Sequence, residues 1–136
     1  MKKLFYFIAA IAVFTIGPQP SAAQDCGDDT KETKLYALTF HADYCGACKK
    51  LKPELVALQP KLEGKSVEWV MFDFTSNETK AKSMEKATEL GLSDIYKDNQ
   101  ATGFVLIVDA ESKEKVAKLT SRQTSAEMYD IVVENL

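Results

Sequence analysis

The chain has 136 residues, of which 46% are hydrophobic and 27% are charged, and its 17 basic and 20 acidic residues give a net charge of −3. This length is enough for one globular domain with a core and too short for two, and no repeat or low-complexity tract divides it. The mildly acidic charge, without a cluster of Lys or Arg, argues against nucleic acid as a partner.

The first 23 residues have the pattern of a secretory signal peptide. Two lysines precede an uncharged apolar run at residues 4–16, and the small residues at 21–23 offer a cleavage site. The run is shorter than the roughly 20 residues that span a membrane, which disfavours the alternative of a retained anchor. We therefore expect cleavage before Gln24, export to the bacterial periplasm and no stable membrane span afterwards.

Residues 24–34 are polar and acidic, and we expect them to form a flexible N-terminal arm ahead of one folded domain at 35–136. Loss of the signal peptide removes two lysines and no acidic residue, so the net charge becomes −5. Cys26 lies on this arm, in a poor context for lipidation. A free or intermolecular thiol is another possibility at this position, but we expect no fixed role for it.

The first predicted element of the domain is a buried parallel strand from Leu35 to Phe40, because this short run is apolar and rich in strand formers. From Ala47 to about Gly64, leucines recur at intervals of four, three and four residues, which predicts an amphipathic helix. Pro53 lies inside this helix and should kink it, because proline lacks a backbone donor and clashes with the preceding turn.

The remaining predicted elements alternate between strands and helices. They are a strand at 67–74 with Trp69 in the core, a helix at 77–90, an irregular connection at 92–101, strands at 104–108 and 115–120, and a last helix capped by Ser125. The last two strands should form an antiparallel hairpin, whereas the first two crossovers are of the βαβ type and predict parallel strands. The predicted fold class is α/β, a small mixed sheet with helices on both faces.

Cys45 and Cys48 lie where the first predicted strand gives way to the first predicted helix. The first turn of a helix has unpaired N–H donors and the positive end of the helix dipole, and both favour a thiolate over a thiol. We therefore expect Cys45 to be the attacking nucleophile, with a lowered pKa. Cys48 lies one turn further in, so it should be the shielded cysteine that resolves a mixed disulfide.

Two other interpretations of the pair have to be weighed. An inert staple would close only a very small loop and would therefore stabilise the fold weakly. A metal site needs more ligands than two thiolates, and Cys26 and His41 complete no familiar zinc spacing. We expect no metal and no cofactor apart from a redox-active Cys45–Cys48 disulfide.

The segment Phe-His-Ala-Asp-Tyr-Cys-Gly-Ala-Cys-Lys at residues 40–49 resembles the active-site segment of the thioredoxin superfamily, which typically reads Phe-Trp-Ala-x-Trp-Cys-Gly-Pro-Cys-Lys. Pro53 matches the proline that kinks the active-site helix of that family. The order of elements from residue 35 to 136 agrees as well. The resemblance implies a thioredoxin-like fold with a shortened start, because residues 24–34 are too few for the first strand and helix of the family.

Around the cysteines the sequence departs from the family pattern. Ala47 replaces the usual proline between the cysteines, which leaves the redox potential open. Thr39 stands where the family has a buried aspartate, and Met71 stands where a lysine often lies near it. Proton transfer at Cys48 must therefore use another group or water.

The resemblance also suggests where substrates bind. Thr102 and Gly103 occupy the place of the family's cis-proline, and we expect a trans bond there because a cis bond without proline costs about 2.5–4 kcal/mol. Tyr44 replaces a tryptophan and should shield the disulfide and contact partners. His41 either packs in the place of another tryptophan, which we favour, or titrates beside the cysteines.

Together these observations predict an exported thiol–disulfide oxidoreductase that exchanges the Cys45–Cys48 pair with protein thiols and disulfides, and that is served by a redox partner still to be identified. Whether it reduces or oxidises its substrates stays open. The alternative is a non-catalytic thioredoxin-like binding or assembly module with a vestigial cysteine pair. The missing aspartate and proline are the best support for that alternative.

Overall fold

The structure is a computed structural model that describes residues 32–136, so the expected signal peptide at 1–23, most of the arm and Cys26 lie outside the described residues. The described elements follow in the order β1 (Leu35–His41), α1 (Gly46–Leu62), β2 (Val67–Asp73), α2 (Asn77–Glu89), α3 (Ser93–Asp98), β3 (Phe104–Asp109), β4 (Lys115–Thr120) and α4 (Ser125–Glu134). None of these helices is both long and apolar enough to cross a bilayer.

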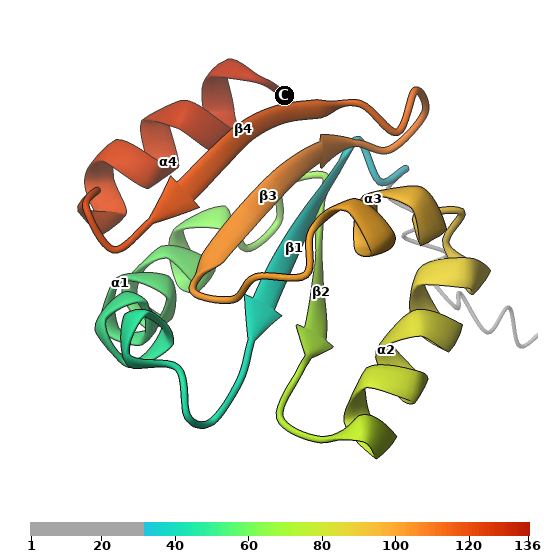
Figure 1. The fold of residues 1–136 in the computed structure, drawn as a ribbon. Coiled ribbons are helices and arrows are strands. Elements are labelled where there is room, and N and C mark those ends of the chain that lie inside the picture. The colour runs from blue at the N-terminus through green and yellow to red at the C-terminus, as the bar shows by residue number, and fades with distance from the viewer. Residues whose placement is uncertain (1–31) are drawn as a thin grey trace, which may run out of the picture.

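The strands form one mixed sheet with the order β2-β1-β3-β4 (Figure 1). β1 pairs in parallel with β2 from Leu35 opposite Val67, and it pairs antiparallel with β3 on its other side. β4 pairs antiparallel with β3 and forms one edge. The fold class predicted from the sequence is therefore confirmed, and β1 lies at the centre of the sheet.

The prediction of parallel strands was wrong for the second crossover, because β3 runs opposite to β1. The cause is α3, which lies in the segment 92–101 that was expected to be irregular. From the end of the sheet where β2 finishes, α2 carries the chain towards the opposite end. α3 and the residues after it carry the chain back, so β3 begins at the end where β2 finishes (Figure 1). The helix was missed because it has only six residues, with Ile95 and Tyr96 as its buried side chains.

The other predicted elements are confirmed with small shifts at their ends. The clearest correction concerns α4, whose N-cap is Thr124 and not Ser125. The Thr124 hydroxyl accepts a hydrogen bond from the Glu127 N–H, and the Glu127 carboxylate accepts one from the Thr124 N–H, so the two residues form a capping box.

The core lies in two layers, one on each face of the sheet. α2 and α3 cover the layer that contains Phe40, Phe72 and Phe104, while α1 and α4 cover the layer that contains Leu58 and Met128. All of these side chains are buried, and the burial of each contributes about 1.5–3 kcal/mol. The carboxyl end of β1 is thus packed on both faces, which gives the cysteine loop a firm base.

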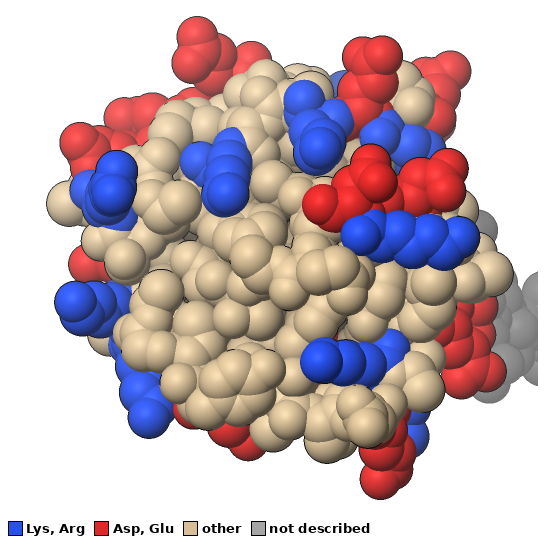
Figure 2. Space-filling model, in the orientation of Figure 1, with Lys and Arg blue, Asp and Glu red and all other residues tan. Residues whose placement is uncertain are grey.

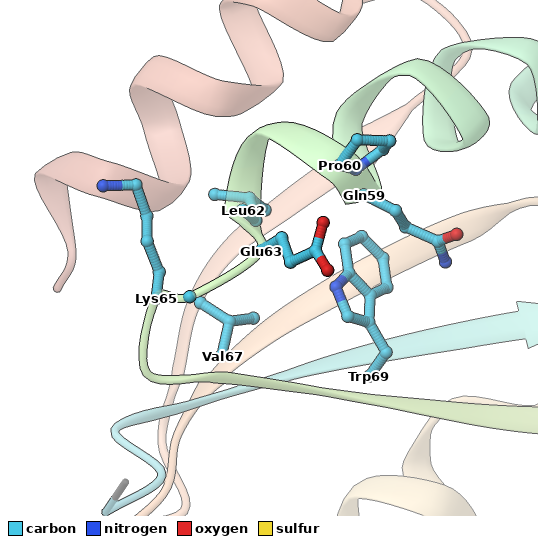
Figure 3. A pocket seen from close by; sticks show the side chains of 8 residues that line it. Gln59, Pro60, Leu62, Glu63, Lys65, Val67 and Trp69 are labelled. Atoms are coloured by element: carbon cyan, nitrogen blue, oxygen red, sulfur yellow. The ribbon is translucent and has the colours of Figure 1, made fainter. Parts of the chain in front are cut away.

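Trp69 was expected in the core but is only half-buried. It lies on the edge strand β2 and lines an open pocket of about 450 Å³ together with Gln59 and Glu63 of the α1 end (Figure 3). Further along β2, Met71 is 62% exposed. Helix α1 thus leaves one face of β2 partly uncovered, and this opening continues towards the cysteines.

Candidate active site

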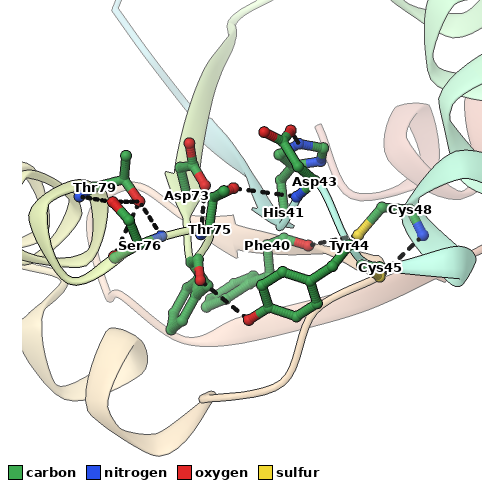
Figure 4. A network of polar contacts seen from close by, with 11 residues as sticks. Phe40, His41, Asp43, Tyr44, Cys45, Cys48, Asp73, Thr75, Ser76 and Thr79 are labelled. Carbon is green, nitrogen blue, oxygen red and sulfur yellow. Dashed lines mark hydrogen bonds and ion pairs between the residues drawn. The ribbon is translucent and has the colours of Figure 1, made fainter.

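The cysteine loop joins the end of β1 to the start of α1. Cys45 is the N-cap of α1, with extended backbone angles of −79° and 110°, and its sulfur accepts a hydrogen bond from the Cys48 N–H at 3.1 Å (Figure 4). The side chain of Cys45 thus satisfies one of the donors that the first turn of a helix leaves unpaired. This is the position that the sequence predicted for the nucleophile.

Cys48 lies one helical turn further in and is buried, with 7% of its surface exposed, whereas Cys45 is half-buried. Both cysteines are in the thiol form. The Cys48 thiol points back towards β1 and makes a long hydrogen bond, of 3.8 Å, to the carbonyl oxygen of Phe40. The two sulfurs therefore have different surroundings, one at the surface and one in the interior.

These surroundings shift the pKa values of the two thiols in opposite directions. Burial alone would raise the pKa of Cys45, but hydrogen bonds from the Cys48 thiol, from Thr102 and from the Cys48 and Ala47 N–H groups together lower it. Burial raises the pKa of Cys48, and the hydrogen bond and charge of Cys45 raise it further. At the same pH, Cys45 therefore carries more thiolate than Cys48 does.

Gly103 brings a distant part of the chain against this loop. Its N–H donates to the Phe40 carbonyl oxygen at 2.8 Å, and its φ of +96° suits glycine. A Cβ atom at this position would lie 3.3 Å from the Cys45 sulfur and 2.6 Å from the Cβ of Ala47. The residues described contain no cis peptide bond, so the bond between Thr102 and Gly103 is trans, as expected.

Tyr44 stands beside Cys45 and is 69% exposed. Its hydroxyl donates to the Phe74 carbonyl oxygen at 3.2 Å, so the ring is held at one end while the rest faces solvent (Figure 4). A large aromatic side chain that is both anchored and exposed suits contact with a partner.

His41 belongs to a polar network that the sequence did not reveal (Figure 4). Its Nε2 lies 3.2 Å from Oδ1 of Asp43, and the Asp43 N–H donates to the Thr75 hydroxyl at 3.1 Å. Burial would raise the pKa of Asp73, but hydrogen bonds from Thr75 and the charge of His41 outweigh this and lower it. The chain positions of Asp43, Asp73 and Thr75 gave no signal of this grouping, because only the parallel pairing of β1 and β2 brings them together.

A pocket of about 270 Å³ lies beside Cys48, between α1 and the strands β1 and β2, and we call it the Cys48 pocket. It is lined by Thr39, Phe40, His41, Cys48, Leu51, Lys52, Leu55, Val56, Gln59 and Met71. Thr39 and Met71 face each other across the β1–β2 pair, as the resemblance to thioredoxins implied. Among residues 32–136, no carboxylate lines this pocket.

No group of three His, Cys, Asp or Glu side chains within residues 32–136 has the arrangement of a metal site. Cys26, which was considered as a further ligand, lies outside that range.

Comparisons with known proteins agree with this geometry. The family model described as Thioredoxin matches residues 28–122, well over half of the chain. A comparison with curated protein sequences gave no match.

Solved structures share the fold at low sequence identity. A DsbH oxidoreductase is 16% identical, with a TM-score of 0.55 over 98% of this chain and 94% of its own. StoA from Bacillus subtilis is 13% identical, with a TM-score of 0.50 over 73% of this chain and 82% of its own. At these identities the likeness establishes the arrangement of helices and strands.

Proposed function

Because this chain belongs to the thioredoxin family, we propose that it is an exported thiol–disulfide oxidoreductase that exchanges the Cys45–Cys48 pair with protein substrates. The observation that carries this proposal is the difference between the two thiols. Cys45 caps a helix with a lowered pKa, while Cys48 is buried behind it with a raised pKa. The structural neighbour DsbH, which is named an oxidoreductase, is consistent with the same chemistry.

The exchange follows from the places of the two sulfurs. The Cys45 thiolate attacks one sulfur of a substrate disulfide, which forms a mixed disulfide and releases the other substrate sulfur as a thiolate. Cys48 then loses its proton and attacks the Cys45 sulfur. The Cys45–Cys48 disulfide forms, the second substrate sulfur leaves, and two electrons have passed to the substrate. The reverse sequence oxidises a dithiol, and a separate redox partner resets the pair.

Substrates would approach the half-buried sulfur of Cys45 beside the Tyr44 ring and the Thr102–Gly103 backbone. Because Gly103 has no side chain, it leaves the Cys45 sulfur open to a substrate; a side chain there would crowd the sulfur. Figure 2 shows both signs of charge interspersed around the margin of one face, with few charged side chains across its middle. Recognition of partners would therefore rest on contact near the cysteines more than on a field of one sign.

Export is supported by the pattern of residues 1–23. Expression of the full chain in a bacterium should give a periplasmic protein whose mass corresponds to a start near Gln24. Recovery of the uncleaved chain in the cytoplasm would contradict export without affecting the proposed chemistry.

The proposed chemistry is tested by reduction of a protein disulfide, such as that of insulin, by the purified protein with dithiothreitol as the electron donor. Replacement Cys45→Ser should abolish turnover, because it removes the nucleophile. Replacement Cys48→Ser should remove the resolving step. The pre-reduced variant, mixed with the substrate after the dithiothreitol has been removed, should therefore form a covalent mixed disulfide, visible on a non-reducing gel.

Gly46→Ser is the matched control, since it adds a hydroxyl in the same loop at a position where a Cβ atom has nothing within 4 Å. It should leave turnover in place. An inactive wild type with a freely reducible Cys45–Cys48 bond would instead favour the non-catalytic binding or assembly module.

A further inference from the structure

The resolving thiol has to give up a proton although little of its own surface is exposed. Cys48 is 7% exposed, and its thiol contacts the Phe40 carbonyl oxygen, at 3.8 Å, and the Cys45 sulfur. A peptide carbonyl accepts a hydrogen bond but does not take the proton away. Because the nucleophile in disulfide exchange is the thiolate, the second step of the proposed reaction needs a proton acceptor near Cys48.

The Cys48 pocket is the route from this thiol to other groups. Its volume of about 270 Å³ is large enough for several water molecules, since each occupies about 30 Å³ in the liquid. The polar side chains that line it besides Cys48 are those of Thr39, His41, Lys52 and Gln59. A hydroxyl, an amide and an ammonium group are poor bases, whereas an imidazole commonly gains and loses a proton near neutral pH.

The surroundings of His41 suit a group that becomes positively charged. Its Nε2 is held by the Asp43 carboxylate at 3.2 Å, an arrangement that favours the tautomer with the proton on Nε2 and leaves Nδ1 as the acceptor. Asp73 on β2 interacts with His41 through its charge, and Lys52 on α1 shares the pocket. Two carboxylates therefore stabilise an imidazolium here against one ammonium group that opposes it.

We propose that His41 accepts the proton of Cys48, through water in the Cys48 pocket, when Cys48 attacks the mixed disulfide. The S–H bond of Cys48 breaks and the proton goes to Nδ1 of His41. The sulfur left behind forms the bond to Cys45, and the substrate sulfur leaves with the electron pair of the mixed disulfide. His41 then returns its proton to solvent. This role rests on the proposed oxidoreductase function and assigns its second step.

The two steps can be separated with Ellman's reagent, an aromatic disulfide whose thionitrobenzoate product is coloured. The protein carries Cys26→Ser, so that only the pair reacts. In stopped flow, attack by Cys45 releases the first thionitrobenzoate, and attack by Cys48 on the protein–thionitrobenzoate disulfide releases the second. The rate of each phase is measured as a function of pH.

The second phase of the otherwise unchanged protein should show an inflection in its pH profile, because a protonated imidazole cannot accept the proton of Cys48. His41→Gln should remove this inflection and slow the second phase at neutral pH by about tenfold, which is less than the ~100-fold or more that general bases typically contribute. The first phase should keep its rate, because the hydrogen bonds that stabilise the Cys45 thiolate do not come from His41. Asp43→Asn, at a 79% exposed side chain, should keep the inflection, because the imidazole that accepts the proton is still present.

Lys52→Gln is the matched control, because it changes another polar group of the same pocket and should keep the inflection. An unchanged pH profile of the second phase in His41→Gln would overturn the proposal, and so would an equal fall of both phases, which would mean that His41 only supports the fold. Absence of the first phase in the unchanged protein would instead refute the proposed oxidoreductase function.

Discussion

Because Gly103 has no side chain, its backbone can lie close to Cys45 and Ala47. Gly103→Ala should lower the free energy of unfolding by about 1–3 kcal/mol, because alanine is strained at a φ of +96° and its Cβ would lie 2.6 Å from that of Ala47. Protein disulfide reduction should fall as well, because the new methyl group crowds the Cys45 sulfur. Urea unfolding and the insulin assay measure the two effects.

Gly64→Ala provides the comparison, since Gly64 also has a positive φ, of +77°, but nothing lies within 4 Å of a Cβ there. It should cost only the backbone strain, about 1–2 kcal/mol, and leave insulin reduction intact. If the two variants reduce insulin equally well, the close approach of Gly103 to the cysteines has no part in the activity.

The position of a single residue could be predicted from the sequence where neighbouring residues determine it, and not where distant residues do. The placement of Cys45 and Cys48 could be predicted because a strand followed directly by a helix puts the intervening cysteine at the helix N-terminus. The contacts of His41 with Asp43 and Asp73 could not be predicted in the same way. The contact with Asp73 depends on the register of β1 against β2, and the contact with Asp43 depends on side-chain direction; hydrophobic periodicity specifies neither.

Among the helices, α4 offers a direct test of a helix start. Thr124→Ala should lower the free energy of unfolding by about 1 kcal/mol, because it removes the hydroxyl that caps the Glu127 N–H. Ser125→Ala should change it by less than about 0.5 kcal/mol, since within the described part of the chain the Ser125 hydroxyl makes only an exposed contact with Lys61. The pair of urea titrations identifies the cap, and a larger loss for Ser125→Ala would contradict the assignment.

The elements with long apolar patterns were predictable, and the short ones were not. Strand β1 is mostly apolar, β3 is a continuous apolar run up to Val108, and α1 has a regular leucine stripe. Helix α3 has six residues and no such stripe, so its stability comes from burying Ile95 and Tyr96 against the sheet layer. Because α3 sets the direction in which the chain enters β3, missing it led to the wrong orientation of that strand.

For the whole molecule, the lowered pKa of Cys45 links folding to pH. Hydrogen bonds lower this pKa against the effect of burial, so the thiolate adds stability that is present above the unfolded pKa of about 8.5 and is lost as the pH falls through the folded value. Cys48, whose pKa is raised mainly by burial, has the opposite effect above about pH 8.5.

We therefore expect the unfolding free energy of the reduced protein, relative to that of Cys45→Ser, to rise between about pH 6 and about pH 8.5. Urea titrations with a phosphine reductant at both pH values measure this difference. Cys45→Ser is the reference for this comparison, because it shares every other ionisable group with the unchanged protein. A difference that stays constant with pH would mean that the Cys45 thiolate is no more stable in the fold than in the unfolded chain.

The carbonyl oxygen of Phe40 accepts both the Gly103 N–H, at 2.8 Å, and the Cys48 S–H, at 3.8 Å. Formation of the Cys45–Cys48 disulfide removes the second donor, because Cys48 then carries no hydrogen on its sulfur. The Gly103 amide therefore no longer shares its acceptor. In a nuclear magnetic resonance spectrum, its amide proton should shift between the reduced and oxidised proteins. The resonance of a single backbone amide thus reports whether the Cys45–Cys48 pair is reduced or oxidised.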